Sequence, residues 1–444
     1  MISEKEKQLA LRSLELARQE GAGQCRICLS KNVTDMVDTL DGEVDKITHS
    51  LDLSLSINLF VDGRYGSFST NKLEEQDLRG FIRDAVAMTR LLAEDPCRGL
   101  PDPARCCHNA VDGNEMLLWD GEIENYDSGK LRAMALEAAV KKREYEGYKV
   151  VSEEGEASIS EFDTITADSN GVFCRQMETN FAYSSQVTIE TEDGRKYSSF
   201  WWESEPYAKN LNYSGVADKA VSLAAAQIGS APAQGGKYNM VVSPESSFKL
   251  VTPLLNALGG YSLQQNSSFL QDSLGKKMFS EGLTIIDDCW RKGESGSRLF
   301  DSEGVASSQD EIISGGVVKK YFLNTYTAAK MGMPPTIEEA TRPRVMPYPE
   351  PGLDRYEIMR KTGSGIYVTG FNGGNCNPAT GDFSYGIEGF RFVDGKLAEP
   401  VSGMLVTGNF LELWQKLLYA GDDPRQSMAK LIPTLAFADV DFNG

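Results

Sequence analysis

The sequence predicts an α+β protein of two domains. The amino-terminal domain is expected to be of an α/β type, with an antiparallel sheet and covering helices, and the carboxy-terminal domain to be mainly antiparallel β. Three observations predict this class. Helical and alternating patterns follow one another in the first half of the chain. Short strand patterns between glycine turns dominate the second half. The chain also has 444 residues, which is more than one compact core usually holds.

The first element is a helix. Ser3 and Glu6 have the spacing of a capping box, Ile2 is placed for a hydrophobic staple, and Gly21 supplies a stop. We therefore expect a helix that begins just after Ser3 and ends before Gly21.

Strands follow this helix over residues 24–70. Asp41-Gly42 and Asp62-Gly63 each separate two extended stretches, and this dipeptide is a strong signal for a tight hairpin. Residues 51–61 alternate, so that one face of the strand is apolar. That face carries Leu51, Leu53, Leu55, Ile57, Leu59 and Val61.

Helical periodicity returns at about residues 73–93, where apolar residues recur three and four positions apart. These residues are Leu78, Phe81, Ile82, Ala85, Met88 and Leu92. Further helices are expected from Asp127, a suitable N-cap, to the stop at Gly147, and over about residues 215–228. A hairpin is expected around Asp193-Gly194.

The Gly/Pro/Ala-rich stretch at residues 229–236 predicts a boundary between domains of residues 1–229 and 236–444. The second domain begins with a strand at Tyr238–Val242 and a helix with Pro244 at its first position. The apolar stripe of this helix is Phe248, Val251, Leu254, Leu255 and Leu258.

The rest of the second domain reads as short strands and one closing helix. The strands are expected at Thr284–Asp287, Glu311–Ile313, Val317–Leu323, Gly365–Thr369 and Phe390–Val393. The closing helix directs inward the side chains of Leu411, Trp414 and Leu418.

Composition excludes several classes of partner. The formal net charge of −19 argues against direct nucleic-acid binding, which relies on clustered Lys and Arg at phosphates. No apolar run approaches the roughly 18 residues that span a bilayer. Met1–Gly21 lacks the apolar core of a secretory signal. We expect a cytoplasmic protein with no direct contact with nucleic acid or membrane.

The cysteines allow two interpretations. Cys25 and Cys28, with Cys106, Cys107 and His108, are residue types of a zinc site. The stretch around the first two has a strand pattern, however, and a strand points residues three apart to opposite faces. The pattern favours buried thiols over a metal site.

The most distinctive segment is Asn377–Gly386, followed by Gly389–Lys396 and Pro400–Gly403. It resembles the carboxy-terminal signature of the TldD/PmbA family, whose members are described as modulators of DNA gyrase and as zinc metallopeptidases. Other blocks resemble the family in the same order, namely Asn266–Leu270, Thr284–Asp288, Phe300–Val305 and Gly408–Phe410.

The resemblance also shows what this chain lacks. In TldD-type members the helix that opens the second domain carries His-Glu-x-x-x-His, and a later cysteine is the third zinc ligand. The matching positions here are Leu255, Asn256 and Gly260, and no cysteine follows Cys376. Leucine and glycine cannot bind zinc, and asparagine is a poor general base. The chain therefore resembles the metal-free PmbA (TldE) type, without catalytic residues or a cofactor of its own. Leu255, Asn256, Gly260 and Asn266 are expected to line a peptide groove.

This resemblance implies a non-catalytic subunit of a heteromeric metalloprotease that processes or degrades unfolded peptides. Zinc is then expected in a TldD-type partner. Two other functions stay open. One is a homodimeric regulator that binds peptides or proteins without proteolysis, and the other is a cryptic metal-dependent hydrolase.

Two groups of polar residues could supply such hidden chemistry. The first is a cluster of carboxylates, which turn formation around strand ends explains without any chemistry, at Asp287, Asp288, Asp301, Glu303 and Asp310. The second is Ser267 and Ser268, which would need an oriented base. The chain has two histidines, His49 and His108, and both lie outside that domain. Trp201, Trp202 and Tyr207 suggest either a peptide-binding surface or ordinary strand packing.

Overall fold

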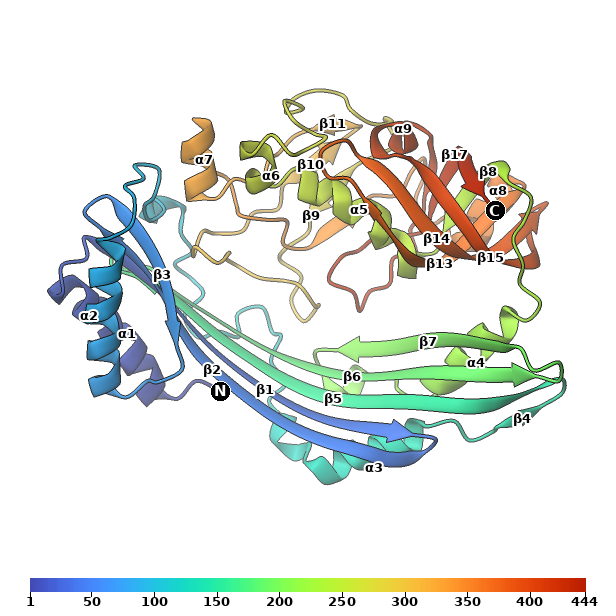
Figure 1. Ribbon diagram of the computed structural model, residues 1–444, viewed down its shortest axis with the longest axis horizontal. Coiled ribbons are helices and arrows are strands. Elements are labelled where there is room, and N and C mark those ends of the chain that lie inside the picture. Colours follow the sequence, from blue (N-terminus) through green and yellow to red (C-terminus); the bar gives the residue numbers. More distant parts are fainter. The chain divides into compact units, whose positions relative to one another are not determined.

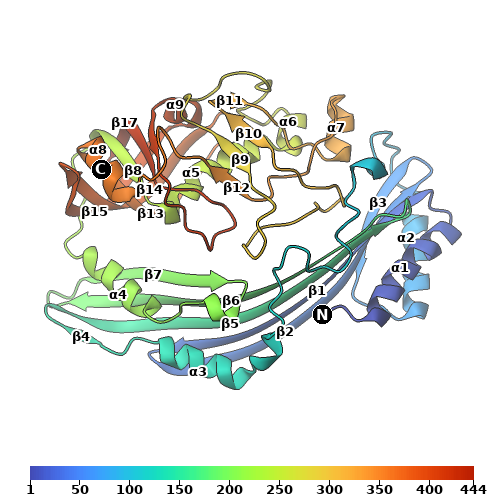
Figure 2. The same ribbon diagram turned by 180° about the vertical axis from the view of Figure 1, so that it is seen from behind.

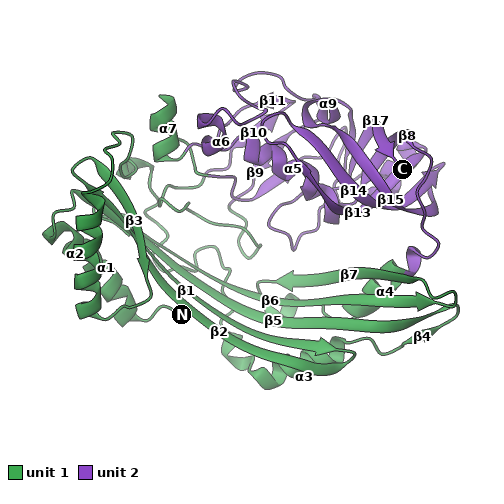
Figure 3. Cartoon of the chain, in the orientation of Figure 1, with its two compact units in different colours: residues 1–224, 290–307, 324–338 green, residues 225–289, 308–323, 339–444 purple.

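The computed structural model describes all residues, 1–444, and the chain forms two compact units (Figure 3). The first consists of Met1–Ala224, Trp290–Ser307 and Asn324–Glu338, and the second of Ala225–Cys289, Ser308–Leu323 and Glu339–Gly444. Both units are therefore discontinuous in sequence. The domain boundary expected at residues 229–236 stays a prediction, because compactness does not show which ranges fold on their own.

The first unit is built on a seven-stranded antiparallel sheet (Figure 1). The strand order is β3-β2-β1-β5-β6-β7, and β4 pairs with β5. The strands are β1 (Gln24–Leu40), β2 (Glu43–Val61), β3 (Arg64–Thr70), β4 (Glu144–Tyr145), β5 (Tyr148–Asp168), β6 (Phe173–Thr191) and β7 (Lys196–Glu205). The helices are α1 (Glu4–Gln19), α2 (Glu75–Thr89), α3 (Ser128–Ala138), α4 (Val216–Ala226) and α7 (Thr325–Met331).

Local signals fix the first helix and the first hairpin as predicted. Ser3 and Glu6 form the capping box at the start of α1. Asp41 and Gly42 both have positive φ, 52° and 81°, as a two-residue type I′ turn requires. The hairpin then pairs Ile27 of β1 with Ile57 of β2.

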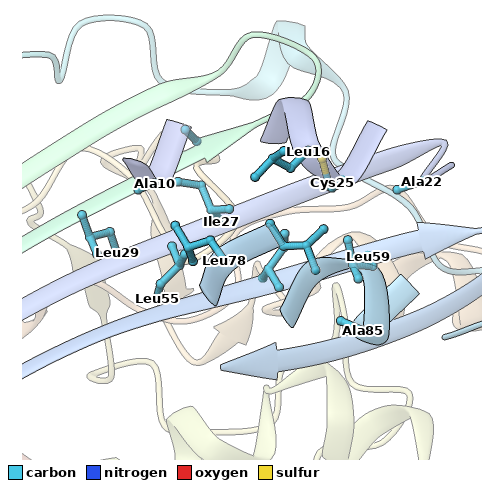
Figure 4. Packing of buried hydrophobic residues seen from close by; sticks show 14 of the residues in the cluster. Ala10, Leu16, Ala22, Cys25, Ile27, Leu29, Leu55, Leu59, Leu78 and Ala85 are labelled. Atoms are coloured by element: carbon cyan, nitrogen blue, oxygen red, sulfur yellow. The ribbon is translucent and has the colours of Figure 1, made fainter. Parts of the chain in front are cut away.

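The largest core of this unit lies between the β1–β2 hairpin and the helices α1 and α2 (Figure 4). Alternate residues of the two strands are fully buried there, namely Cys25, Ile27, Leu29, Leu55, Ile57, Leu59 and Val61. The predicted apolar face of residues 51–61 is thus confirmed, except that Leu51 is 56% exposed.

A second cluster covers the other end of the same sheet face, under α3 (Figure 2). Val37 of β1 packs there with Leu131 and Ala135 of α3. Val37 lies ten residues beyond Ile27, and residues separated by an even number share one face of a strand. The stretch of β1 between the two clusters, residues 31–36, is half-buried.

Two predicted helices differ from the structure. Met88 lies within α2 but is 56% exposed, and Leu92, 47% exposed, lies beyond the end of α2 at Thr89. α3 ends at Ala138 rather than at Gly147. The backbone is extended at Ala139, and the backbone N–H of Val140 donates to the buried carboxylate of Glu153 at 2.8 Å.

The second unit contains a closed ring of strands and a small four-stranded sheet. The larger sheet has the order β15-β14-β13-β8-β17-β16, and β15 also pairs with β17, which closes the ring. Its strands are β8 (Gly236–Val242), β13 (Gly365–Cys376), β14 (Asp382–Val393), β15 (Lys396–Asn409), β16 (Leu417–Ala420) and β17 (Leu435–Asn443). The smaller sheet contains β9 (Ile285–Asp287), β10 (Glu311–Ser314), β11 (Val317–Val318) and β12 (Pro343–Val345).

Four helices belong to this unit, namely α5 (Pro244–Ala257), α6 (Gly260–Gln264), α8 (Arg355–Thr362) and α9 (Phe410–Gln415). Trp414 of α9 is fully buried and meets Phe437 edge to face, with ring centres 5.2 Å apart. The strand expected at residues 317–323 ends at Val318. None of the helices in the chain is both long and apolar enough to cross a membrane.

The buried face of the β1–β2 hairpin gives a direct stability prediction. Ile57→Ala should lower the free energy of unfolding by about 2–5 kcal/mol, because it leaves a cavity between two strands and two helices. Leu91→Ala, at a side chain 86% exposed, should change it by less than about 0.5 kcal/mol. Urea denaturation followed by circular dichroism measures both, and equal effects would contradict this account of the core.

Candidate functional site

The candidate site begins with α5 and α6 of the second unit. Pro244 occupies the first turn of α5, where its missing N–H costs nothing. The helix buries Leu250, Val251, Leu254 and Leu255, and ends at Ala257, before Gly259. One member of the predicted stripe does not fit, because Phe248 is 39% exposed.

The four predicted groove residues lie in one segment, which runs from the end of α5 through the short turn after it to the residue pair that follows α6. Leu255 and Asn256 are in the last turn of α5, Gly260 opens α6, and Asn266 follows α6 with a positive φ of 53°. Leu255 is 8% exposed, whereas Asn256 is exposed and Gly260 is buried. That these residues bind a peptide stays a prediction.

Backbone hydrogen bonds hold the turn between α5 and α6. The N–H of Gly260 donates to the carbonyl of Phe322 at 2.7 Å, and the N–H of Phe322 donates to the carbonyl of Leu258 at 2.9 Å. A Cβ on Gly259 would lie 3.0 Å from the carbonyl oxygen of Asn256. The turn is therefore tightly held by the main chain.

The signature segment supports the same region from the other side. The N–H of Phe269 donates to the carbonyl of Pro378 at 2.9 Å, and the N–H of Phe410 donates to the carbonyl of Gly381 at 2.9 Å. Gly381 has a φ of 80°, and a Cβ there would lie 3.1 Å from the ring of Phe269. A glycine is needed at this position both for its backbone conformation and for space.

Aromatic rings continue the support along the hairpin of β13 and β14. The rings of Phe383 and Phe410 have centres 4.7 Å apart, and those of Phe383 and Tyr385 are stacked at 5.5 Å. The ammonium of Lys249, on α5, lies 5.2 Å from the ring centre of Tyr385. These contacts join α5 to the signature hairpin.

Asp382 closes the turn of the signature. Its carboxylate accepts hydrogen bonds from Thr380 and Asn409, which hold the pKa of Asp382 below its usual value. Asn409 also caps α9 through the N–H of Leu411 at 2.9 Å. The signature residues therefore build a stable hairpin.

The donor chemistry of this region does not fit the family's zinc ion. Leu255 has no ligating atom and Gly260 has no side chain, so neither can replace an imidazole. No group of three or more His, Cys, Asp and Glu side chains in the chain is arranged to hold a metal ion. Cys376 is half-buried at the end of β13, and burial raises the pKa of its thiol.

Four of the other cysteines lie in two separate packing clusters. Cys25 is fully buried under α1, and this burial raises the pKa of its thiol to about 11. Cys106, Cys107 and Cys174 pack together in another cluster. A hydrogen bond from the thiol of Cys174 lowers the pKa of Cys107 to about 6.

The carboxylates that lie close together in the sequence make separate contacts in the structure. In the second unit, Asp287 accepts the backbone N–H groups of Thr341 and Arg342 at 2.8 and 2.6 Å. Asp288 lies 3.8 Å from Arg344, and Asp310 pairs with Lys320. These contacts agree with the structural interpretation.

In the first unit, Asp301 accepts the N–H groups of Glu303, Val305 and Glu338 at 2.9–3.1 Å. Burial nevertheless raises its pKa to about 6. Glu303 lies 3.3 Å from Arg26 and accepts two hydrogen bonds from Thr325. Both side chains hold loop segments in place.

The candidate serines donate to main-chain carbonyls and not to a base. Ser267 Oγ donates to Ser262 at 3.2 Å, and Ser268 Oγ donates to Ala257 at 2.5 Å. His49 pairs with Asp35 at 2.8 Å, and His108 contacts the carbonyl of Pro103. The geometry thus offers no serine nucleophile with a base beside it.

Two of the aromatic residues singled out in the sequence, Trp201 and Trp202, lie on β7, the last strand of the first unit, and pack on each other. Trp202 stacks on Phe200 with ring centres 5.5 Å apart and lies 5.8 Å from Trp201. Tyr207 donates its hydroxyl to the carbonyl of Leu117 at 2.8 Å.

Comparison with known proteins identifies one family along the chain. Residues 25–89 match domain 1 of the PmbA/TldA metallopeptidases, residues 122–228 match the central domain, and residues 235–444 match the C-terminal domain. "Metalloprotease PmbA" of Escherichia coli O157:H7 is 26% identical over 93% of this chain and 90% of its own length.

Solved structures agree with these matches. A protein of Bacteroides thetaiotaomicron VPI-5482, described as a modulator of DNA gyrase, is 36% identical, with a TM-score of 0.94 over 100% of both chains. TldE from Thermococcus kodakarensis, 20% identical, shares the fold, with a TM-score of 0.79 over 98% of this chain and 100% of its own.

The position of Leu255 can be tested by its effect on stability. Leu255→Ala should lower the free energy of unfolding by about 2–5 kcal/mol, because it leaves a cavity at a buried position of α5. Asn256→Ala is the matched control one residue away, and its exposed side chain should cost less than about 0.5 kcal/mol. Chemical denaturation of both variants is the measurement. A neutral Leu255→Ala would mean that this side chain is not part of the scaffold.

Proposed function

Because the chain belongs to the PmbA/TldD metallopeptidase family, we propose that it is a non-catalytic, metal-free subunit of a heteromeric metalloprotease that processes or degrades unfolded peptides. One observation carries the proposal. Leu255 and Asn256, at the end of the well-packed helix α5, and Gly260, at the start of α6, stand where TldD-type members are expected to have His, Glu and His.

The scaffold around the lost motif supports this reading. The turn after α5 is held by the backbone of Phe322, and the signature hairpin is fixed through Phe269 and Gly381. These contacts keep the end of α5 and the signature hairpin in a defined arrangement. We infer that the region still shapes a surface for substrate, while a zinc-bearing TldD-type partner performs hydrolysis.

The substrate is proposed to be an extended or unfolded peptide. Addition of a peptide strand to the larger sheet of the second unit has limited room, because that sheet closes into a ring through β15 and β17. The contacts we favour are two exposed side chains of α5, Phe248 in its first half and Asn256 in its last turn.

The alternatives find less support. A cryptic hydrolase built on Asp287 and Asp288 would need free carboxylates, but Asp287 already accepts two backbone N–H groups. Direct regulation of gyrase on DNA is opposed by the net charge of −19. A homodimeric binding protein without proteolysis remains the main competitor.

The purified chain alone should hold no stoichiometric zinc and should not cleave an unfolded casein substrate. A zinc-bearing TldD-type subunit from the same cells should co-purify with a tagged copy, and the complex should cleave casein until a chelator is added. Native mass spectrometry in chelator-free buffer gives composition and metal content together. A folded complex with Leu255→Ala should retain cleavage, because this side chain carries no chemistry.

Three results would count against the proposal. Stoichiometric zinc on the isolated chain would contradict the metal-free assignment. Cleavage by the chain alone that is lost in a folded Asp287→Asn/Asp288→Asn variant would favour the cryptic hydrolase. A homodimer that never binds a zinc subunit would favour the binding protein.

A further inference from the structure

The strand β2 has an edge that is only partly covered. β1 pairs with one edge of β2 from Glu43 to Phe60. β3 pairs with the other edge only from Leu55 to Val61. The backbone groups of residues 43–54 on that second edge therefore have no partner strand. An open edge of this length is a template for another strand.

The side chains along this edge are unusually apolar for a solvated strand. Ile47 is 55% exposed and Leu51 is 56% exposed. They share the helix-covered face of the sheet with His49, because the three alternate along the strand. Lys46 and Asp52 are exposed on the opposite face.

The order of these residues is self-complementary. When two copies of the strand pair antiparallel about a twofold axis at His49, each residue faces the one equally far from His49 on the other copy. Ile47 then faces Leu51, and Lys46 faces Asp52. Each of these favourable pairs occurs twice.

Neighbouring registers lose the charge pairing, although an axis at Ser50 would still place Ile47 opposite Leu53. Moving the axis by one residue, to Thr48 or Ser50, places Lys46 opposite a serine, Ser50 or Ser54.

With the axis at His49, the apolar pairing would also continue into β1, since Ile47 is paired with Val37 and Leu51 with Val33. Two short apolar rows would then cross the junction between the copies.

The ordinary interpretation of charges on an open edge is protection against non-specific pairing. Here the charges have opposite signs at equal distances from His49, so one register is favoured over the others. The two ends of the open part of β2 also agree with pairing centred on His49. The register of β2 is irregular between Val44 and Lys46, and β3 occupies the edge from Leu55 onward.

We propose that residues 46–52 of β2 are a docking edge for a second copy of this chain, with antiparallel strand pairing centred on His49. The edge lies in the sheet of the first unit and includes none of the candidate site residues. The inference is therefore independent of the proposed function.

Charge reversal tests the pairing. Asp52→Lys places like charges opposite each other twice and should weaken self-association at least about tenfold. Lys46→Asp should do the same, and Lys46→Asp/Asp52→Lys should restore association. Sedimentation velocity over a range of concentrations gives the dissociation constants. Asp52→Lys is the cleaner single variant, because Asp52 faces Asn32 in β1 whereas Lys46 faces Asp38.

A cysteine at the axis tests the register. With copper–phenanthroline and oxygen accepting two electrons and two protons, His49→Cys should form an intermolecular disulfide, because its two copies face each other. Ser50→Cys is the matched control, and its two copies are offset by two residues and should cross-link more slowly. Peptide mapping distinguishes these bonds from those of the native cysteines.

Agreement of the charge swap and the cross-link would support the proposal. A wild-type chain that stays monomeric at every concentration would overturn it. So would a dimer that ignores both single reversals, or an edge that pairs only with a different protein. Circular dichroism and thermal unfolding of each variant separate loss of pairing from loss of fold.

Discussion

The register of the β1–β2 hairpin is the constraint on which the first unit depends. The turn at Asp41-Gly42 and the register shift between Val44 and Lys46 together set it, and a slip of one residue would move every side chain to the other face. In the observed register Ile27 and Ile57 meet under α1 and α2. The same register brings Ile47 and Leu51 onto the open edge of the sheet. The turn and the register shift beside it therefore determine both the core and the surface offered to another chain.

In the second unit, the contacts that hold the end of α5 and the signature hairpin do not involve metal-binding side chains. The turn after α5 and the signature hairpin are held by backbone hydrogen bonds and by the contact of Gly381 with Phe269. None of these contacts requires a metal ligand at residue 255 or 260. A leucine at residue 255 instead joins the apolar side of α5. These contacts therefore stabilise the second unit without a metal ligand at either position.

Much of the fold followed from short-range signals in the sequence. The capping box of Ser3 and the Asp-Gly turns act over a few residues, so they could be predicted. The exposure of Met88 could not, because periodicity shows which residues share a face but not how far the neighbouring core extends. The early end of α3 depends on Glu153, a partner from a later strand. The positions of the candidate site came from resemblance to a family, since neither leucine nor glycine carries a chemical signal of its own.

Long-range partners also explain why the first unit is discontinuous. The guanidinium of Arg26, mostly buried on β1, is paired with Glu303, which lies 277 residues further along the chain. The carboxylate of Glu303 also receives the N–H and hydroxyl of Thr325, at the start of α7. An isolated amino-terminal half would leave this arginine without its partner, and an unpaired buried charge is costly. The first unit therefore includes segments, Trp290–Ser307 and Asn324–Glu338, that follow the start of the second unit in the sequence. The first unit can complete its packing only after these segments have been synthesised.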